Sequence, residues 1–368
     1  MSTPAPPESA PAPAGERRRR GWRALSRRVR TMIVGAVLFV VLFTLALTMP
    51  VPYVALTPGP TYNTLGKDDN GNTIIKITGV PVRQTSGHLN MTTVDVSTQS
   101  ITAFQALQGW LEHDTVIVPR AAVYPPGQTE KQTDQQNKQE FSQSQDSAIV
   151  AAACQLGYPK RFGVASVVSS GASYGKLQPS DLITSVDGAA ATTADALTAI
   201  LAGKSPGMTV SVDVVREGKP VTVPVTLGPP LSGRAGGSLG ITVSESVCQA
   251  PFHVDLGLGN QIGGPSAGMM FALGIIDEVG STDLTRGRFI AGTGTIDPSG
   301  QVGPIGGIQL KMIAARDKGA TIFLAPASNC SDVRGAIPPG LEVIKVSTLA
   351  QAVQVLQDSA AGTSVPHC

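Results

Sequence analysis

The stretch N-Q-I-G-G-P-S-A-G-M-M-F-A-L-G-I-I-D-E-V, residues 260–279, defines both a local fold and a candidate site. It has the pattern of a glycine-rich turn that leads into an apolar helix, with Pro265 where a helix can begin. Ser266 lies at that helix N-terminus, where backbone N–H groups and the helix dipole favour negative charge. A serine in this position is either a simple N-cap or a nucleophile beside an oxyanion site.

A nucleophilic serine needs a base, and the sequence offers two candidates. His253 lies thirteen residues before Ser266 in F-H-V-D-L, which looks like a strand and gives no reason to place the two side by side. Lys311 lies in G-G-I-Q-L-K-M-I-A-A-R-D-K-G, close to Ile308 on the apolar face of a predicted helix. Burial on that face would lower the pKa of the amine until it can accept a proton. The alternative is a lysine at the edge of the apolar stripe whose ammonium reaches solvent.

Three motifs strengthen the catalytic interpretation when they are taken together. They are G-G-P-S-A-G-M (263–269), G-T-G-T-I-D-P-S-G-Q-V-G-P-I-G-G-I-Q-L-K-M-I-A-A-R-D-K-G-A (292–320) and I-F-L-A-P-A-S-N (322–329). In this order they resemble the proteolytic domain of Lon proteases, over roughly residues 240–357.

The resemblance implies a role for three residues. Ser266 matches the catalytic serine of the family, and Lys311 matches its catalytic lysine. Thr293 matches the threonine that orients the lysine through a hydrogen bond. Gly263 is a departure, because many Lon proteases carry an acidic residue three positions before the serine.

A second departure concerns ATP. Lon proteases have an ATPase module, whereas these 368 residues contain no G-x-x-x-x-G-K-[ST] motif. We therefore expect peptide-bond hydrolysis without ATP-driven unfolding, on unfolded or extended segments, and we expect no cofactor.

The N-terminal region predicts a membrane anchor. Thr31 to Met49 is free of charge, and nineteen helical residues span about 28 Å, close to the roughly 30 Å of a hydrocarbon core. This run is longer than the apolar part of a signal peptide and lacks a good cleavage site after it. Eight arginines among residues 17–30 precede it, and positive flanks stay in the cytoplasm. The remainder of the chain is therefore expected outside.

The charge distribution argues against a nucleic-acid binder. The whole chain has a formal net charge of +2, but the positive charge is concentrated in the first thirty residues. A nucleic-acid surface would need that charge on a folded domain.

Residues 53–154 are expected to form a β-rich juxtamembrane region. T-I-I-K-I-T-G-V and M-T-T-V-D-V-S-T alternate as strands do, and residues 101–113 have helical spacing. The Gln-rich stretch 124–146 is a long loop or an exposed helix that leads into the apolar S-A-I-V-A-A-A-C-Q-L-G-Y. No catalytic constellation is visible here, and a platform next to the membrane is the expected role.

Residues 155–229 predict a separate unit with the order strand, strand, helix and two strands. Its segment L-Q-P-S-D-L-I-T-S-V-D-G (177–188) resembles the PDZ pattern L-x-x-G-D-x-I-x-x-V-N-G, with Ser180 where glycine is usual. The resemblance implies a groove that captures a peptide as an added strand. There is no obvious G-L-G-F carboxylate loop, and Arg161-Phe162-Gly163 is the nearest candidate.

The four cysteines all lie in the part expected outside the membrane, where disulfides persist, and three pairings are possible. The chain has no C-x-x-C or H-E-x-x-H motif, so a zinc site is not expected.

The sequence thus predicts a multidomain α+β protein with a single transmembrane helix, a PDZ domain and a Lon-type α/β proteolytic domain. The expected units are a disordered basic tail (1–30), the span (31–52), the juxtamembrane region (53–154), the PDZ domain (155–229), the proteolytic domain (236–358) and a C-terminal tail (359–368).

The predicted function is that of a membrane-tethered, ATP-independent serine endopeptidase with a Ser–Lys dyad. Its expected partners are protein or peptide substrates and the membrane, with a homo-oligomeric ring implied by the Lon resemblance. The alternatives are a non-catalytic PDZ scaffold with a vestigial protease domain and a Ser–His–Asp hydrolase that uses His253.

Overall fold

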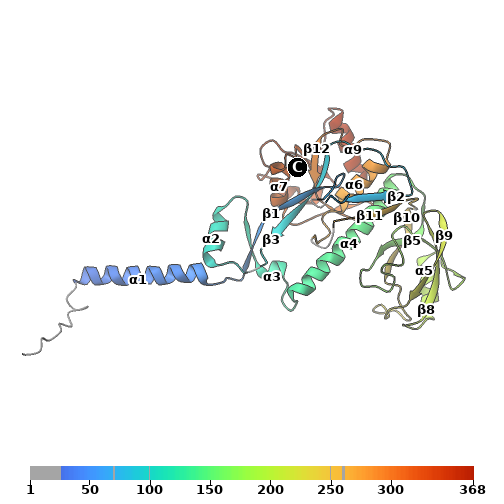
Figure 1. Ribbon diagram of the computed structural model, residues 1–368, viewed down its shortest axis with the longest axis horizontal. Coiled ribbons are helices and arrows are strands. Elements are labelled where there is room, and N and C mark those ends of the chain that lie inside the picture. The colour runs from blue at the N-terminus through green and yellow to red at the C-terminus, as the bar shows by residue number, and fades with distance from the viewer. Residues whose placement is uncertain (1–25, 69–70, 99, 249, 259–261) are drawn as a thin grey trace, which may run out of the picture.

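The computed structural model describes residues 26–68, 71–98, 100–248, 250–258 and 262–368. A long helix, α1 (Arg27–Thr48), projects from one end of the folded body (Figure 1) and has no buried residue. It begins at the Ser26 cap and is long and apolar enough to cross a membrane, with a mean hydropathy of 2.5. Of the expected tail, residues 1–25 lie outside the described residues, and Arg27 to Arg30 are helical instead.

The central sheet has six strands in the order β16-β15-β12-β3-β1-β4. These are β1 (Tyr53–Asn63), β3 (His88–Val96), β4 (Val116–Pro119), β12 (Phe289–Gly292), β15 (Ile322–Pro326) and β16 (Glu342–Val346). β12 pairs in parallel with β3 and β15, whereas β1 pairs antiparallel with β3 and β4. Strands from the expected juxtamembrane region therefore complete the sheet of the C-terminal unit and form no separate platform.

Helices cover both faces of this sheet, which explains its nearly continuous apolar strands. Along β15, Ile322 and Leu324 belong to the core shared with α4, α6 and α9, while Phe323 faces the opposite layer with α7. The helices are α4 (Glu130–Gln155), α6 (Gly268–Val279), α7 (Ile308–Asp317) and α9 (Leu349–Ala360). Smaller elements complete this part: α2 (Ala103–Leu111), α3 (Arg120–Val123), η1 (Ala327–Asn329), α8 (Cys330–Val333), β2 (Ile75–Thr78) paired with β11 (His253–Leu256), and β13 (Thr295–Ile296) paired with β14 (Val302–Gly303).

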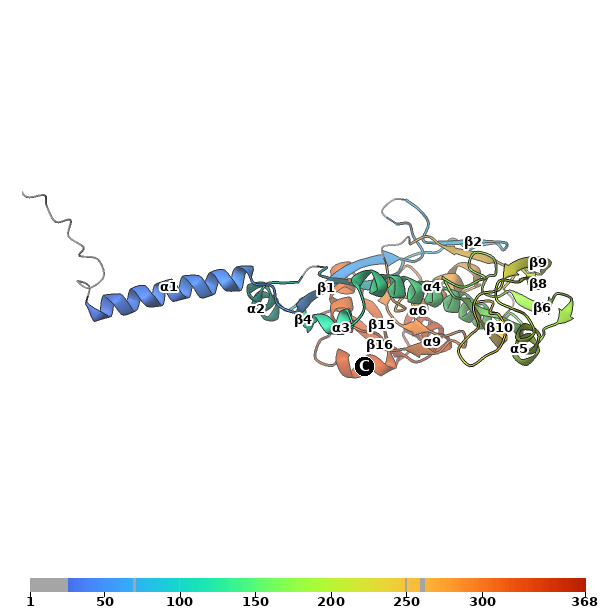
Figure 2. The same ribbon diagram turned by 90° about the horizontal axis from the view of Figure 1, so that it is seen from below.

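A second unit with its own core lies at the end of the molecule farthest from α1, as the turned view in Figure 2 shows. It contains β5 (Lys160–Val167), β6 (Leu182–Val186), β7 (Ala189–Ala190), α5 (Ala194–Ala202), β8 (Thr209–Arg216) and β9 (Lys219–Thr226). The expected order of strands and helix is confirmed, with the short β7 added. Ser180 has a φ of 69°, so it adopts the left-handed conformation that the glycine of the PDZ pattern adopts readily.

Strand β10 (Ile241–Cys248), at the start of the expected proteolytic domain, pairs antiparallel with β5. Leu239, just before it, is buried in the core of the second unit. The physical reason is that β5 needs a partner to satisfy its backbone, and the strands β6 to β9 form a sheet of their own.

Two disulfides use all four cysteines, Cys154–Cys248 and Cys330–Cys368. The first joins the end of α4 to β10, and the second fixes the C-terminus to α8. The segment 359–368 is accordingly held in place, since the Lys345 N–H also donates to the Pro366 carbonyl at 3.0 Å.

Candidate active site

The loop that carries Ser266 is held from two sides. Ser266 lies two residues before the first residue of α6, and its carbonyl accepts hydrogen bonds from Gly294 N–H at 2.8 Å and from the Thr293 hydroxyl at 3.0 Å. On the other side, α4 binds the two preceding residues. Gly264 N–H donates to the Asn137 carbonyl at 2.8 Å, and the Ser144 hydroxyl donates to the Pro265 carbonyl at 2.8 Å.

Helix α4 also accounts for the glycines of this loop. A Cβ on Gly268 would lie 2.5 Å from the Ser144 hydroxyl oxygen, and one on Gly263 would lie 2.9 Å from the Asn137 Cβ. Gly263 stands where many Lon proteases have an acidic residue, and here Asn137 of α4 lies against the space of that side chain. Sequence reasoning missed the contribution of α4. The available signal was the row of small residues Ser144, Ser147, Ala148 and Ala151 at helical spacing, which permits close packing of two helices.

Lys311 meets Ser266 at the end of the cleft. Its Nζ lies 2.7 Å from the Ser266 Oγ and 3.0 Å from the Thr293 Oγ1, so the structure brings the three predicted site residues together. The helix that carries Lys311, α7, begins after Gly307, whose φ of 69° is left-handed and lets the chain turn sharply. Lys311 projects from the buried face of that helix, and the lysine is only 3% exposed.

The burial of Lys311 has a chemical consequence. Removal from water disfavours the ammonium form, and this lowers the pKa of the lysine from 10.5 to about 8. A substantial fraction of the amine is therefore neutral at mildly alkaline pH. A neutral amine has a lone pair that can accept the proton of the neighbouring Ser266 hydroxyl.

A cleft of ≈ 360 Å³ opens in front of the two side chains. Its walls come from β1, β3 and the loop 262–267, including Tyr62, Met91 and Ile262. Among the described residues that line it, the charged ones are Lys311 and Asp95. The wall formed by β1 and β3 could not be predicted from local sequence patterns, because those strands lie more than 150 residues before Ser266.

His253 does not reach this cleft. It lies on β11, where it pairs with Thr78 of β2, and it lines a different pocket together with Asp146 and Asp181. The described residues that line the cleft with Ser266 do not include it. The geometry therefore gives no support to a triad built on His253.

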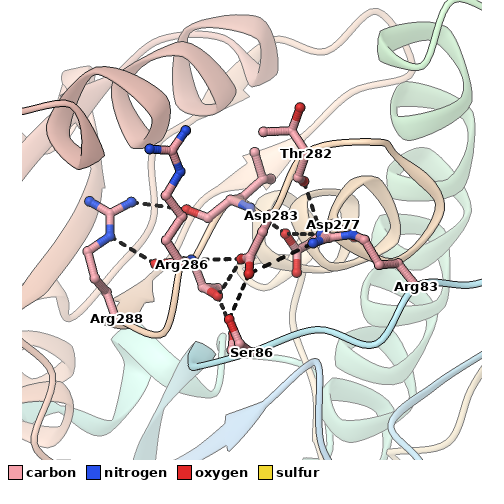
Figure 3. Close-up of polar contacts among 9 residues, drawn as sticks. Arg83, Ser86, Asp277, Thr282, Asp283, Arg286 and Arg288 are labelled. Atoms are coloured by element: carbon pink, nitrogen blue, oxygen red, sulfur yellow. Dashed lines mark hydrogen bonds and ion pairs between the residues drawn. The ribbon is translucent and has the colours of Figure 1, made fainter.

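The far end of α6 is fixed by a polar cluster (Figure 3). Arg83, from the segment before β3, donates to the carbonyl oxygens of Asp277 at 2.6 Å and Thr282 at 3.0 Å, and to the Asp277 carboxylate at 3.1 Å. Ser86 donates to Asp283 at 2.7 Å. With α4 holding the loop at one end and this cluster holding the other, α6 is a rigid support for Ser266.

In the described part of the chain, no group of three or more His, Cys, Asp or Glu side chains is arranged to hold a metal ion.

Two family models match the chain. The model of the PDZ domain matches residues 134–227, and the model of the Lon protease (S16) C-terminal proteolytic domain matches residues 243–359. The first match includes much of α4, and the second includes Ser266, Thr293 and Lys311.

Individual relatives agree with the second match. Lon protease 2 of Bacillus subtilis is 34% identical over 101 residues, which are 27% of this chain and 18% of that protein. The Lon protease of Roseiflexus castenholzii is 36% identical over 88 residues, 24% of this chain and 11% of that protein. The Lon protease of Rickettsia prowazekii is 37% identical over 95 residues, 25% of this chain and 12% of that protein. This chain thus spans less than a fifth of the length of these relatives.

Among solved structures, the PDZ domain of the SdrC-like protein from Listeria monocytogenes is similar to part of the chain. It is 25% identical with a TM-score of 0.21, and the match covers 23% of this chain and 88% of that one.

Proposed function

We propose that this chain, which joins a PDZ domain to a Lon-type proteolytic domain, is a PDZ-containing Lon-like serine endopeptidase with a Ser266–Lys311 dyad. The observation that carries the proposal is the 2.7 Å distance between Lys311 Nζ and Ser266 Oγ, beside a cleft large enough for a peptide segment. A lysine that is 3% exposed has the lowered pKa that a base requires.

In the proposed reaction, neutral Lys311 takes the proton of Ser266 while the hydroxyl oxygen attacks a peptide carbonyl. Thr293 holds the amine in line with the serine through its 3.0 Å contact with Nζ. The oxyanion forms near the start of α6, where the backbone N–H of Ser266 and the helix dipole stabilise negative charge. Lys311 then gives its proton to the leaving amine, and water hydrolyses the acyl-enzyme through the same base.

The proposal includes cleavage without ATP. The substrates are then segments that are already unfolded, extended or short, because no motor in these 368 residues pulls a folded domain apart. Assembly of several copies into a ring, which the Lon resemblance implies, belongs to the same proposal and is measured by the mass of the detergent-solubilised protein.

The PDZ domain is proposed to recruit or gate the substrate. Within the described strands β10 pairs only with β5, so its other edge is open to an added strand. A groove runs between this edge and α5, and Leu197, Leu201, Ile241 and Arg234 are among the residues that line it. These features favour an extended segment beside β10. We propose this groove in place of Arg161-Phe162-Gly163 as the docking place, because Arg161 and Phe162 line a different pocket.

Membrane attachment through α1 completes the proposal. The helix is 22 residues long, and none of its residues is buried in the folded protein. The arginines that precede its apolar part favour a cytoplasmic N-terminus. The PDZ and proteolytic domains are then outside the cytoplasmic membrane.

The decisive experiment compares variants of the full chain on an unfolded protein without ATP. Ser266→Ala and Lys311→Ala are expected to lose cleavage, while Lys318→Ala, an exposed lysine just after the same helix, is expected to retain it. Full cleavage by both dyad variants would refute the dyad. His253→Ala is expected to be mild, and loss of activity there would favour the histidine alternative.

A serine-directed acylating probe separates the protease from the non-catalytic PDZ scaffold. Labelling of Ser266 that depends on Lys311 is expected. If the probe fails to label Ser266 at any pH between neutral and alkaline, the scaffold interpretation is favoured.

A further inference from the structure

The short helix α2 presents an apolar face that the rest of the described chain does not cover. Its large side chains are strongly exposed: Phe104 is 38% exposed, Leu107 55%, Trp110 76% and Leu111 69%. The helix is well formed, because Thr102 and Gln105 make a complete capping box at its start. Four large apolar side chains together on one short helix indicate a binding surface.

The exposed side chains share one side of the helix. Phe104, Leu107 and Leu111 have the i, i+3, i+7 spacing of a single face, and Trp110 lies beside it. Gly109 lies on the opposite side and is the buried residue of α2. A Cβ there would approach side-chain atoms of Thr115 and Ile117 to 2.8 Å, so this side packs against β4 and the segment that leads into it. The apolar face therefore points away from the body.

Helix α2 is fixed to the point where the chain leaves α1. Val51 N–H donates to the Ile101 carbonyl at 2.9 Å, and Ala103 N–H donates to the Met49 carbonyl at 3.4 Å. The rings of Phe43 and Phe104 meet edge to face at 6.1 Å. Both views show α2 lying across the end of α1 instead of along it (Figure 1, Figure 2).

The contact between Phe43 and Phe104 indicates how deep α2 lies relative to the end of α1. Phe43 lies six residues before Met49, the C-cap residue of α1, which is about 9 Å along a helix axis. The apolar face of a helix that lies in a membrane surface enters about 5–10 Å below the headgroups. A side chain that touches Phe43 is therefore at the depth that such a face reaches when α1 spans the bilayer.

We propose that α2 is an interfacial helix that inserts Phe104, Leu107, Trp110 and Leu111 into the outer surface of the same bilayer. The partner is lipid, because the face continues directly from the surface of α1, and because tryptophan is enriched at this depth. The inference rests on the proposed membrane span. Since residues 102–111 carry no charge, insertion needs apolar burial alone and does not require anionic lipid. Together α1 and α2 hold the proteolytic domain in a fixed orientation on the membrane.

Tryptophan fluorescence tests the inference directly, because Trp22 and Trp110 are the two tryptophans of the chain. The full-length Trp22→Phe variant, reconstituted in phosphatidylcholine vesicles, reports on Trp110 alone. We expect emission at shorter wavelength than in an aqueous site, and stronger quenching by lipid brominated near the headgroup than by lipid brominated at the bilayer centre. A matched control carries Leu231→Trp with both natural tryptophans changed to Phe, since Leu231 is 54% exposed on the distant PDZ unit. It should show no quenching.

A further variant separates this inference from the membrane span itself. Phe39→Trp in the tryptophan-free background places the probe within α1, where deep bromines should quench it. If the α1 probe is quenched and Trp110 is not, the interfacial helix is refuted while the span stands. If the α1 probe is not quenched, the span is refuted and the inference falls with it. Emission of Trp110 that shifts with protein concentration but ignores lipid bromine would show that a second copy covers the face, and this would overturn the proposal.

Discussion

The Ser144 hydroxyl donates to the Pro265 carbonyl oxygen at 2.8 Å, so α4 supports the residue directly before Ser266. Two positions further along the same helix, the Asp146 carboxylate accepts the Val167 N–H of β5 at 2.9 Å. One helix thus touches the nucleophile loop of the proteolytic domain and a strand of the PDZ unit. Figure 1 shows α4 running between these two parts of the molecule.

Ser144→Ala is expected to lower kcat about three- to tenfold with little change in KM. The reason is that one hydrogen bond of about 1 kcal/mol no longer holds the loop, and the half-buried Pro265 carbonyl loses a partner. Steady-state kinetics on an unfolded substrate measures the effect, and Gln143→Ala, at the exposed neighbouring position, is the matched control. An unchanged kcat in Ser144→Ala, with the fold intact, would show that the hydrogen bond does not position Ser266.

Thr293→Val is expected to lower kcat about tenfold, because it removes the hydroxyl that contacts both Lys311 Nζ and the Ser266 carbonyl. Thr293→Ser keeps the hydroxyl and should restore most of the activity. A purely structural role would make thermal stability and activity fall together in both variants. A positioning role predicts that Thr293→Val also moves the midpoint of the pH–activity profile.

Activity is expected to rise with pH, with a midpoint near 8. The catalytic form of Lys311 is the neutral amine, and burial lowers its pKa to about 8, so the active fraction grows as pH rises through that value. A profile of kcat/KM between neutral and alkaline pH measures the midpoint. Lys311→Arg should be inactive throughout, because a guanidinium stays protonated. A profile that falls over this range would contradict the assignment of Lys311 as base.

Asp95 is expected to favour substrates with a basic side chain near the cleaved bond. It shares the charged lining of the cleft with Lys311, and Lys311 is already engaged with the dyad partners. We expect kcat/KM for a peptide with lysine near the cleaved bond to be about two- to fivefold higher than for the same peptide with glutamate, which is the size of one exposed ion pair. This difference should weaken with added salt. Asp95→Asn should remove it, and Asp95→Lys should reverse it. If the ratio of kcat/KM for the lysine peptide to kcat/KM for the glutamate peptide is the same in the unmodified protein, Asp95→Asn and Asp95→Lys, this role of Asp95 is excluded.

The stability of the protein is expected to fall between about pH 4 and 7. Burial raises the pKa of Asp146 to about 7, so the folded state holds a proton that the unfolded chain releases near 3.8. This contribution to stability is fully present below the unfolded-state pKa of 3.8 and is lost as pH rises to the folded-state pKa of about 7. Asp146→Asn keeps an acceptor for Val167 and should flatten the melting temperature over this range.

Glu278 contributes in the same direction, because burial and the neighbouring Asp277 raise its pKa to about 7. Glu278→Gln should therefore flatten part of the same curve independently. A melting temperature that rises with pH in the unmodified protein would contradict both assignments.

Several features could be predicted from the sequence because they depend on neighbours within a few residues. The uncharged run of residues 31–49 predicted helix α1, and the glycine-rich turn predicted that Ser266 lies just before α6. The left-handed Asp187-Gly188 and Glu217-Gly218 pairs gave the turns of the PDZ unit. The apolar period around Lys311 placed it on the inner face of α7, where it is buried.

Other features depend on contacts between segments that are far apart, and local patterns do not encode them. Alternation marked β1 and β3 as strands, but alternation is the same whether a strand pairs with its neighbour or completes a distant sheet. The Gln-rich half of α4 lacks an apolar stripe, so only its packing shows that it supports the nucleophile loop.

The amino-acid sequence by itself determined which side chains carry the candidate chemistry and that an apolar helix precedes the folded domains. Only the tertiary structure decided that Lys311 Nζ lies 2.7 Å from Ser266 Oγ, that strands from the N-terminal region form the wall of the cleft, and that α2 lies against the end of α1. The physical reason is that helix caps and periodicity act over one or two turns, whereas these distances are set by the close packing of the whole core.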